Sequence, residues 1–335
     1  MESILVTGAS GFIGSFIVEE ALRRKFGVWA GIRSSSSREY LHDRKIHILE
    51  LDFAHPNELR AQLSGHKGTY NKFDYIVHCA GVTKCANNNE FDHVNYLQTK
   101  YFVDMLRELN MIPKQFIFVS TLSVFGPVRE QTYDPISEHD TPCPNTDYGF
   151  SKLKAELYLQ SIPGFPYVIY RPTGVYGPRE KDYFLMAKSI KQHMDFSVGF
   201  HRQDLTFVYV KDIVQAVFLG IEKKVVRRGY FLTDGKVYRS RVFSDLIRKE
   251  LGNPFVIRFR CPLIVLKLVS LLADFWAKRR KTTSTLNPDK YRIMKQRNWQ
   301  CDITPAIEEL GYNPEYDLER GVKETIAWYK EKGWL

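Results

Sequence analysis

The sequence predicts an α/β fold in which a parallel sheet is covered by helices on both faces. Two observations lead to this prediction. Short apolar runs of strand length alternate with amphipathic stretches of helix length over the first half of the chain, and the first apolar run ends in a glycine-rich turn. Strands separated by helices pair in parallel, because each helix returns the chain to the same edge of the sheet. We therefore expect a doubly wound parallel sheet with a smaller, mostly C-terminal α/β lobe.

The strands of the first half follow one another at regular intervals. They are expected at 4–6, 28–32, 46–51, 75–78, 116–119 and 167–170, with helices at 11–24, 95–109 and 151–160. After Pro172 the alternation loosens, because glycine and proline residues mark a loop. A strand-like run at 206–210 follows. These patterns predict a first domain over 1–172, to which part of 205–235 returns, and a substrate lobe over 173–335.

Composition limits the class of protein. The chain has 335 residues, of which 44% are hydrophobic, enough for one large core or two domains. Its five cysteines are odd in number and form no Cys-x-x-Cys pair, so we expect reduced thiols, no metal site and a cytoplasmic protein. No signal peptide is recognisable at the start. The net charge of +10 suits an anionic membrane surface or a phosphorylated substrate, and no nucleic-acid motif accompanies it.

The apolar segment 262–277 has two interpretations. It is shorter than the roughly 20 residues that a membrane span needs, and Lys267 and Asp274 interrupt it. We expect a core helix of the second lobe. The alternative is a helix that faces lipid or an apolar substrate, with the basic run 278–281 behind it meeting lipid headgroups as a peripheral membrane contact.

The glycine-rich turn after the first strand predicts a dinucleotide site and a Rossmann-type first domain. Glycine is needed where the turn is tight and where the backbone approaches a pyrophosphate, whose charge meets the free N–H groups of the next helix. The strand–turn–helix context makes the motif specific. The residues expected at the cofactor's phosphates are Gly8, Ser10, Gly11, Phe12, Ile13 and Gly14.

The ends of the next strands indicate which cofactor binds. An NAD site carries an acid after the second strand, whereas this chain has Arg33, which suits the 2′-phosphate of NADP. We therefore prefer NADP and keep NAD as the alternative. Asp52 and Phe53 are expected beside the adenine. Cys79, Ala80 and Gly81 are expected near the phosphates and ribose.

Tyr148 and Lys152 lie four residues apart on the predicted helix, so their side chains share one face. A free phenol has a pKa of about 10 and is a poor base at neutral pH. A nearby ammonium group favours the phenolate and lowers its pKa. The pair therefore predicts a tyrosine that transfers a proton.

Together these motifs resemble the extended short-chain dehydrogenase/reductase family. The similar stretches are spread over nearly the whole chain. They are the Gly8/Gly11/Gly14 turn, 51–53, 78–81, 95–99, 119–126, Tyr148-x-x-x-Lys152, 171–178, 310–314 and 328–329. The resemblance implies an NAD(P)-dependent enzyme that transfers hydride at a secondary alcohol or ketone.

The resemblance also implies roles for individual residues. Tyr148 would be the catalytic acid/base, Lys152 would tune it and hold the nicotinamide ribose, and Thr121 would hydrogen-bond the substrate oxygen. Asn95 would orient a helix or a water. Pro172 and Val175 would lie over the nicotinamide. The candidates for substrate binding are Thr83, Lys84, Thr121 and Tyr176. The family further implies a homodimer.

The substrate stays open at this point. Leu122 and Ser123 stand where dehydratases of this family carry an Asp-Glu pair, which argues against dehydration. Leu205 stands where sugar epimerases commonly present an arginine for the diphosphate, and Arg202 could substitute only if the loop shifts. The apolar segment favours a reductase or 3β-hydroxysteroid-dehydrogenase-like enzyme. A nucleotide-sugar epimerase is the alternative, and a non-catalytic NADP-binding sensor or structural subunit is a third reading.

Overall fold

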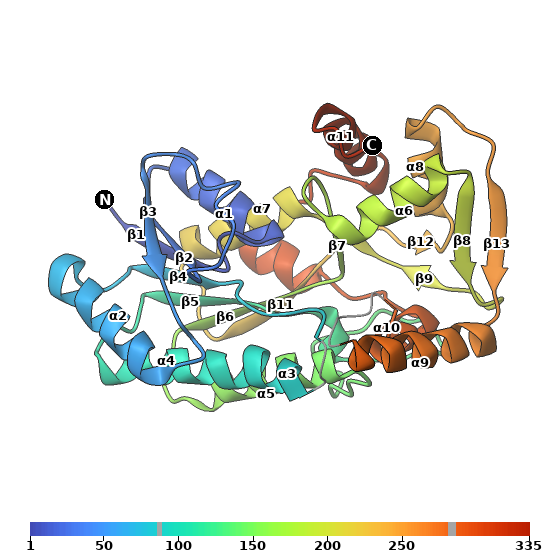
Figure 1. The fold of residues 1–335 in the computed structure, drawn as a ribbon. Helices are drawn as coiled ribbons and strands as arrows, with labels where there is room; N and C mark the ends of the chain where they lie inside the picture. The colour runs from blue at the N-terminus through green and yellow to red at the C-terminus, as the bar shows by residue number, and fades with distance from the viewer. Residues whose placement is uncertain (86–88, 281–285) are drawn as a thin grey trace. The chain divides into compact units, whose positions relative to one another are not determined.

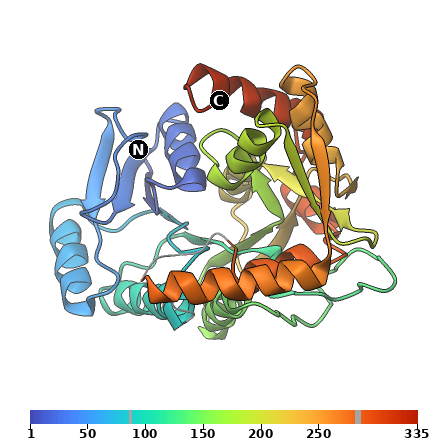
Figure 2. The same ribbon diagram turned by 45° about the vertical axis from the view of Figure 1, so that its right-hand side comes forward.

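The computed structural model of the protein describes residues 1–85, 89–280 and 286–335 (Figure 1, and turned by 45° in Figure 2). The chain forms two compact units, each assembled from separated segments. Unit 1 contains Met1–Thr121, Asp147–Arg171 and Val214–Tyr230, and unit 2 contains Leu122–Thr146, Pro172–Ile213 and Phe231–Leu335. The predicted boundary at 172 placed 122–146 in the first domain, whereas these residues belong to unit 2 because they fold back on other segments of that unit, such as 296–302.

Unit 1 is built on a seven-stranded sheet with the order β11-β6-β5-β4-β1-β2-β3. Its strands are β1 (Ser3–Thr7), β2 (Gly27–Ile32), β3 (Ile46–Glu50), β4 (Tyr75–His78), β5 (Gln115–Val119), β6 (Tyr167–Pro172) and β11 (Arg228–Leu232). The pairings from β3 through β6 are all parallel. Because β1 lies between β4 and β2, the strand order reverses beside it, which is the point where doubly wound sheets bind ligands.

Helices cover both faces of this sheet. Figure 1 shows α1 (Phe12–Arg23) and α7 (Val210–Glu222) over one face, and α2 (Pro56–Tyr70), α4 (Gln98–Glu108) and α5 (Asp147–Ser161) over the other. Every residue of β4 and β5 is buried, as expected for central strands covered on both sides. Phe102, Phe116 and Phe118 belong to the core cluster on the side of α4 and α5. The predicted parallel α/β fold is therefore confirmed.

A short π-helix interrupts the approach to α4. Residues Asp92–Leu97 are π-helical between the single turn α3 (Asn89–Phe91) and α4, where the sequence predicted one continuous helix from 95. Single π-helical turns are found often at functional sites. Here the π-helix carries Asn95.

Unit 2 contains three two-stranded sheets among the residues described: β10-β7, β12-β9 and β13-β8. Their strands are β7 (Gly174–Tyr176), β8 (Met194–Val198), β9 (Asp204–Leu205), β10 (Phe207–Tyr209), β12 (Tyr238–Arg239) and β13 (Ile257–Cys261). The helices are α6 (Lys181–Lys191), α8 (Val242–Glu250), α9 (Leu263–Arg279), α10 (Pro288–Lys295) and α11 (Leu318–Glu331), with short helical turns at Leu122–Val124 and Ala306–Leu310. Aromatic rings of β7, β10 and α8 form the core of this unit.

The apolar helix predicted over 262–277 forms, but it is not the core helix that we expected. Among the side chains of α9 that the structure describes, only Leu266 and Ser270 are buried, while Leu268, Leu272 and Trp276 are more than half exposed. No helix in the described part of the chain combines the length and apolarity needed to cross a membrane.

Candidate active site

The first turn of α5 carries the tyrosine, and the next turn carries the lysine. Because α5 begins at Asp147, Tyr148 and Lys152 stand on one face, as the spacing predicted. Lys152 is only 5% exposed. Its Nζ donates a 2.7 Å hydrogen bond to the carbonyl of Val119 and lies 4.2 Å from the centre of the Phe118 ring. The end of β5 therefore fixes the lysine.

Thr121 is a hydrogen-bond partner of the tyrosine. It follows β5 by two residues, and its hydroxyl shares a hydrogen bond with that of Tyr148. The carboxyl end of β5 thus positions both Thr121 and the partner carbonyl of Lys152. The structure brings together the three residues that the resemblance assigned to proton transfer.

The electrostatics of this group differ from the expectation. Burial raises the pKa of Tyr148 to about 12, although the hydrogen bond with Thr121 opposes that shift. Burial also lowers the pKa of Lys152 to about 8. The prediction that Lys152 brings the phenol towards neutrality is therefore wrong for this structure, because desolvation outweighs any attraction between the two groups. A further positive charge beside the phenol would be needed to favour its phenolate.

Asn95 connects the loop after β4 to α5. Its Oδ1 accepts from the backbone N–H of Val82 at 2.8 Å, and its Nδ2 donates to the carbonyl of Val82 and to the hydroxyl of Ser151, both at 3.0 Å. A Cβ on Gly81 would lie 2.9 Å from Asn95 Oδ1 and 3.9 Å from Lys152 Nζ. Asn95 is 1% exposed, so its observed role is to position these segments.

The glycine-rich turn forms a cradle that side chains would fill. A Cβ on Gly8, whose φ is +67°, would lie 2.8 Å from the backbone nitrogen of Ala80, and a Cβ on Gly14 would lie 2.3 Å from the carbonyl oxygen of Gly8. Gly11 is exposed and begins α1 without a side-chain cap, and the first turn of α1 has no acidic residue. The free N–H groups of Phe12 and Ile13 can thus meet a phosphate. These residues fit a dinucleotide, with Ser10 half-buried beside them.

The residues at the carboxyl end of β4 pack against the glycine-rich turn. Cys79 and Ala80 lie against the turn, since their backbone nitrogens donate to the carbonyl oxygen and Oγ1 of Thr7. His78, just before them, is buried between Thr7 and Thr99, and burial lowers its pKa to about 3. It is therefore a neutral structural histidine.

At the carboxyl ends of β2 and β3, the Arg33 side chain is exposed and could contact a cofactor, whereas the Phe53 side chain is buried. No salt bridge holds the Arg33 side chain within the described chain, and its backbone N–H donates to Ser36 Oγ. Asp52 is partly exposed and binds His55 at 2.9 Å. The ring of Phe53 packs in the core against His78 and Phe102, so its side chain cannot face an adenine as predicted.

The remaining predicted site residues have different environments. Thr83 is exposed and Lys84 is partly exposed, both in the loop after β4. Pro172 ends β6 and Val175 lies in β7, where their part in cofactor binding stays a prediction. Tyr176 is fully buried in the core of unit 2, and its hydroxyl donates to the carbonyl of Asp317. The prediction that it contacts substrate is not supported, because its side chain has no exposed surface.

A buried ion pair supports α5 behind the site. Glu156, one turn beyond Lys152, accepts hydrogen bonds from Arg171 of β6 at 2.7 to 3.2 Å and from the hydroxyl of Ser120. The pair therefore joins the helix to the ends of two strands.

We expect Glu156→Ala to destabilise the protein by about 3–5 kcal/mol, because it removes the buried carboxylate that accepts three hydrogen bonds from the 8%-exposed Arg171. Glu108→Ala is the matched control, since the Glu108–Arg60 pair is half exposed and its loss should cost at most about 1 kcal/mol. Urea unfolding monitored by circular dichroism measures both. Equal losses would contradict a structural role for the buried pair.

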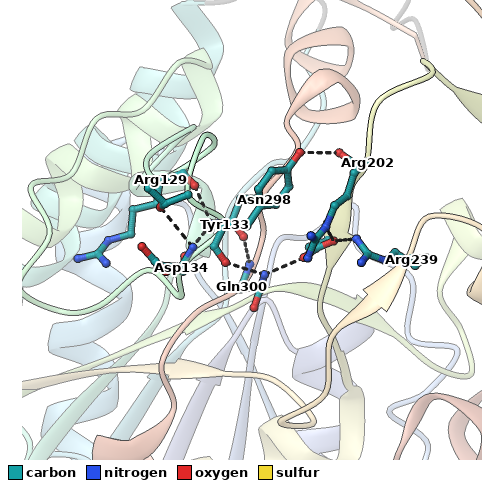
Figure 3. A network of polar contacts seen from close by, with 9 residues as sticks. Arg129, Tyr133, Asp134, Arg202, Arg239, Asn298 and Gln300 are labelled. Carbon is teal, nitrogen blue, oxygen red and sulfur yellow. Dashed lines mark hydrogen bonds and ion pairs between the residues drawn. The ribbon is translucent and has the colours of Figure 1, made fainter.

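Unit 2 contains a polar network around one buried carboxylate (Figure 3). Arg202 donates to both oxygens of Asp204, at 2.8 and 2.6 Å, and Arg239 donates to Oδ1. The Asp204 side chain is 2% exposed, while those of Arg202 and Arg239 are 53% and 57% exposed. Two guanidinium groups thus share a single carboxylate, which leaves an excess positive charge at the surface.

Loops at both sides hold this network in place. Gln300 donates to Asp204 Oδ2 and to the carbonyl of Tyr133, and the Tyr133 hydroxyl donates to the carbonyl of Arg202 (Figure 3). Asn298 donates to the carbonyl of Asp134 at 2.8 Å. Hydrogen bonds from neighbouring loops therefore hold Asp204 and Arg202 in position.

Sequence reasoning missed Ser151, Glu156 and Arg239. Ser151 stands inside the Tyr148-x-x-x-Lys152 motif, so its position gave a signal. Arg239 gave none, because it becomes the partner of Asp204 only through the antiparallel pairing of β12 with β9. Leu205, at the position where an arginine was sought, is partly buried in β9.

The chain is similar to proteins of one family over its whole length. The model of the NAD dependent epimerase/dehydratase family matches residues 4–230. The uncharacterized UDP-glucose epimerase YtcB of Bacillus subtilis is 29% identical over 344 residues, which cover 97% of each protein. The sterol-4-alpha-carboxylate 3-dehydrogenase, decarboxylating, of Dictyostelium discoideum is 24% identical over 97% of this chain and 100% of its own. Other curated relatives include dTDP-D-glucose 4,6-dehydratases.

Solved structures share the fold. The crystal structure of UDP-glucose 4-epimerase with UDP-glucose from Thermotoga maritima superposes with a TM-score of 0.79 and covers 98% of this chain and 99% of that one, at 22% sequence identity. At that identity the likeness concerns the fold alone.

Proposed function

The chain belongs to the NAD-dependent epimerase/dehydratase family, and from that premise we propose that it is an epimerase acting on a nucleotide sugar. The family consists of NAD-dependent enzymes, and the relatives that match this chain end to end include proteins named UDP-glucose epimerases. The observation that carries the substrate class is the exposed Arg202 and Arg239 pair around Asp204.

The arginine pair suits a diphosphate. Guanidinium groups bind phosphate oxygens through paired N–H donors, and a nucleotide sugar carries two phosphates side by side. Arg202 and Arg239 together carry one more positive charge than Asp204 balances, and both keep more than half of their side chains exposed. They would take the role of the arginine that sugar epimerases of this family commonly carry at the position of Leu205.

The chemistry uses the unit 1 site. A bound nicotinamide cofactor would supply the group that takes a hydride from the sugar carbon and gives it back. Tyr148 would take the proton from the sugar hydroxyl and give it back after the ketone has turned its other face, while Thr121 would hold that oxygen. The positive charge of the oxidised nicotinamide would oppose the burial that raises the pKa of Tyr148. The reaction is redox-neutral overall, so no second substrate is consumed.

The test is direct. Purified protein is incubated with UDP-glucose or UDP-galactose and either cofactor, and the anomeric proton signals are followed by NMR. Interconversion of the two sugars is the expected result. Arg239→Gln should raise KM for the UDP-sugar about 10- to 100-fold with little change in kcat, because a charge-assisted contact to the diphosphate is lost. No interconversion across a panel of UDP- and dTDP-sugars would overturn the proposal.

A second candidate is a dehydrogenase or reductase for an apolar alcohol or ketone. It is favoured by the exposed apolar side chains of α9 and by the similarity to a sterol dehydrogenase. This candidate predicts a net change in absorbance at 340 nm with steroids or hydrophobic ketones, whereas an epimerase gives no net change with its sugar.

The cofactor preference makes its own prediction. We propose that Arg33 binds the 2′-phosphate of NADP, because it is exposed at the carboxyl end of β2 and no acid stands there. Arg33→Ala should weaken NADPH binding about 10-fold or more by calorimetry and leave NADH binding nearly unchanged. Arg44→Ala removes the same charge before the amino end of β3 and is the control. If Arg33→Ala weakens both cofactors equally, the site is one for NAD.

A further inference from the structure

Helix α9 presents a wide apolar surface that no described part of the chain covers. Ile264 is 76% exposed, Leu268 57%, Leu272 60% and Phe275 57%. Val265, Val269, Leu271 and Trp276 are also about half exposed. At 100° per residue these eight side chains occupy an arc of roughly 160°, and the one charged residue of α9 within it is Arg279, the last residue of the helix. An uncovered apolar face of this size marks a binding surface.

The opposite side of α9 anchors it to unit 2. Leu266 and Ser270 are buried at 6% and 1%, and they lie on the side of the helix away from the apolar arc. The helix therefore lies along the surface of its unit, with its apolar face turned outward. It has 17 residues and does not qualify as a membrane span.

Basic residues border the apolar arc. Lys267 stands at its edge and is exposed, and exposed Arg279 and Arg280 follow Trp276 at the helix end. Asp274 is the only acid on α9. Among the described residues, none of these three cations takes part in a salt bridge. Lys281, also in the basic run, lies outside the described residues.

The strand that leads into α9 has the same character. On β13 and its partner β8, Ile257 pairs with Met194 and Phe259 with Phe196, and all four side chains are at least 36% exposed. The rings of Phe196 and Phe259 stack with their centres 5.3 Å apart. Arg260, also exposed, lies over the ring of Phe200. Exposed apolar side chains and cations therefore continue from β13 into α9.

We propose that α9 binds in the plane of an anionic lipid surface. An in-plane helix combines an apolar face that enters the acyl boundary with cations that meet anionic headgroups, and tryptophan favours the boundary between the two. The charge decides between the possible occupants. A second copy of this chain would bring the same cations into contact with one another, whereas an anionic bilayer neutralises them. This inference is independent of the reaction that the enzyme catalyses.

Co-sedimentation of the full chain with vesicles tests the proposal. Wild-type protein should sediment with phosphatidylcholine vesicles that contain phosphatidylserine, and binding should fall at least about tenfold with phosphatidylcholine alone. Leu268→Glu combined with Leu272→Glu should reduce binding to the serine-containing vesicles by at least about tenfold, because both carboxylates would enter the acyl boundary. Leu185→Glu on α6, at a 48%-exposed position, is the control and should bind like wild type.

Fluorescence gives a second readout. Vesicles should shift the emission of the wild-type protein to shorter wavelength, and Trp276→Phe should lose most of that shift. The other four tryptophans of the chain stay in place as internal references. Thermal melts verify that each variant is folded.

Three outcomes would overturn the proposal. Wild-type protein could stay in the supernatant with phosphatidylserine vesicles, or the double glutamate variant could sediment as wild type does. Alternatively, light scattering could find a wild-type dimer that the double variant converts to a monomer, without lipid binding by either. The face would then join two copies of the chain.

Discussion

Tyr148→Phe is expected to lower kcat by about 10²- to 10⁴-fold while the protein stays folded and binds its cofactor. The substitution removes one oxygen atom, which in the structure shares a hydrogen bond with Thr121. Without that hydroxyl, no proton can move between α5 and the substrate oxygen. Turnover of the UDP-sugar at saturating cofactor is the measurement, with a melting curve for each variant.

Tyr158→Phe is the matched control on the same helix. Its hydroxyl donates to Asp104 and therefore serves packing between α5 and α4. This variant should lose some stability and keep its kcat. If Tyr148→Phe and Tyr158→Phe retained the same activity, Tyr148 would not be the proton-transfer residue.

Gly14→Ala is expected to remove cofactor binding and to cost about 1–3 kcal/mol of stability. Its Cβ would lie 2.3 Å from the carbonyl oxygen of Gly8, and the backbone at Gly8 is itself held against Ala80. The turn would have to open, and the N–H groups at the start of α1 would no longer point towards the pyrophosphate. Titration with NADH and NADPH by fluorescence measures the loss for both cofactors.

Gly65→Ala gives the opposite result and is the control. Gly65 lies in the middle of α2, and no atom stands within 4 Å of the added Cβ. Alanine in that position should stabilise the helix by up to about 1 kcal/mol and leave cofactor binding unchanged. If Gly14→Ala binds cofactor as tightly as Gly65→Ala does, the glycine turn is not the phosphate cradle.

The first half of the chain was predictable because its signals are local. Six of the seven strands in the unit 1 sheet were predicted from short apolar runs, whereas β11, which begins with Arg228 and Gly229, was not. The glycine turn, Tyr148 and Lys152 lie at spacings that a sequence displays directly. Thr121 and Asn95 needed the family resemblance, since a hydroxyl at a strand end and an amide on a helix have many uses. Their contacts with Tyr148 and Ser151 then followed from the structure.

The errors came from burial and long-range pairing, which a sequence does not display. The apolar residues of α9 predicted a core helix, yet most of their side chains are exposed. The aromatic rings of Phe53 and Tyr176 were expected at the cofactor and substrate sites, and they pack in hydrophobic cores. The pKa of Tyr148 rises because desolvation outweighs its neighbours, a balance set by packing. The contact between Arg239 and Asp204 depends on the pairing of β12 with β9, which lie more than thirty residues apart in the sequence.

The segmented construction of the two units has a consequence for how the protein can be divided. The chain changes unit after Thr121, Thr146, Arg171, Ile213 and Tyr230, so a single cut at any position leaves at least one unit without some of its segments. Thr121 is the last residue before one of these changes, and Tyr148 stands two residues after the next. Truncated fragments such as 1–172 should therefore be insoluble or unfolded. Limited proteolysis between 122 and 146 should inactivate the enzyme, because Thr121 after β5 and Tyr148 at the start of α5 would no longer be held at fixed positions relative to each other. Synthesis past Tyr230 is needed before unit 1 has all its parts.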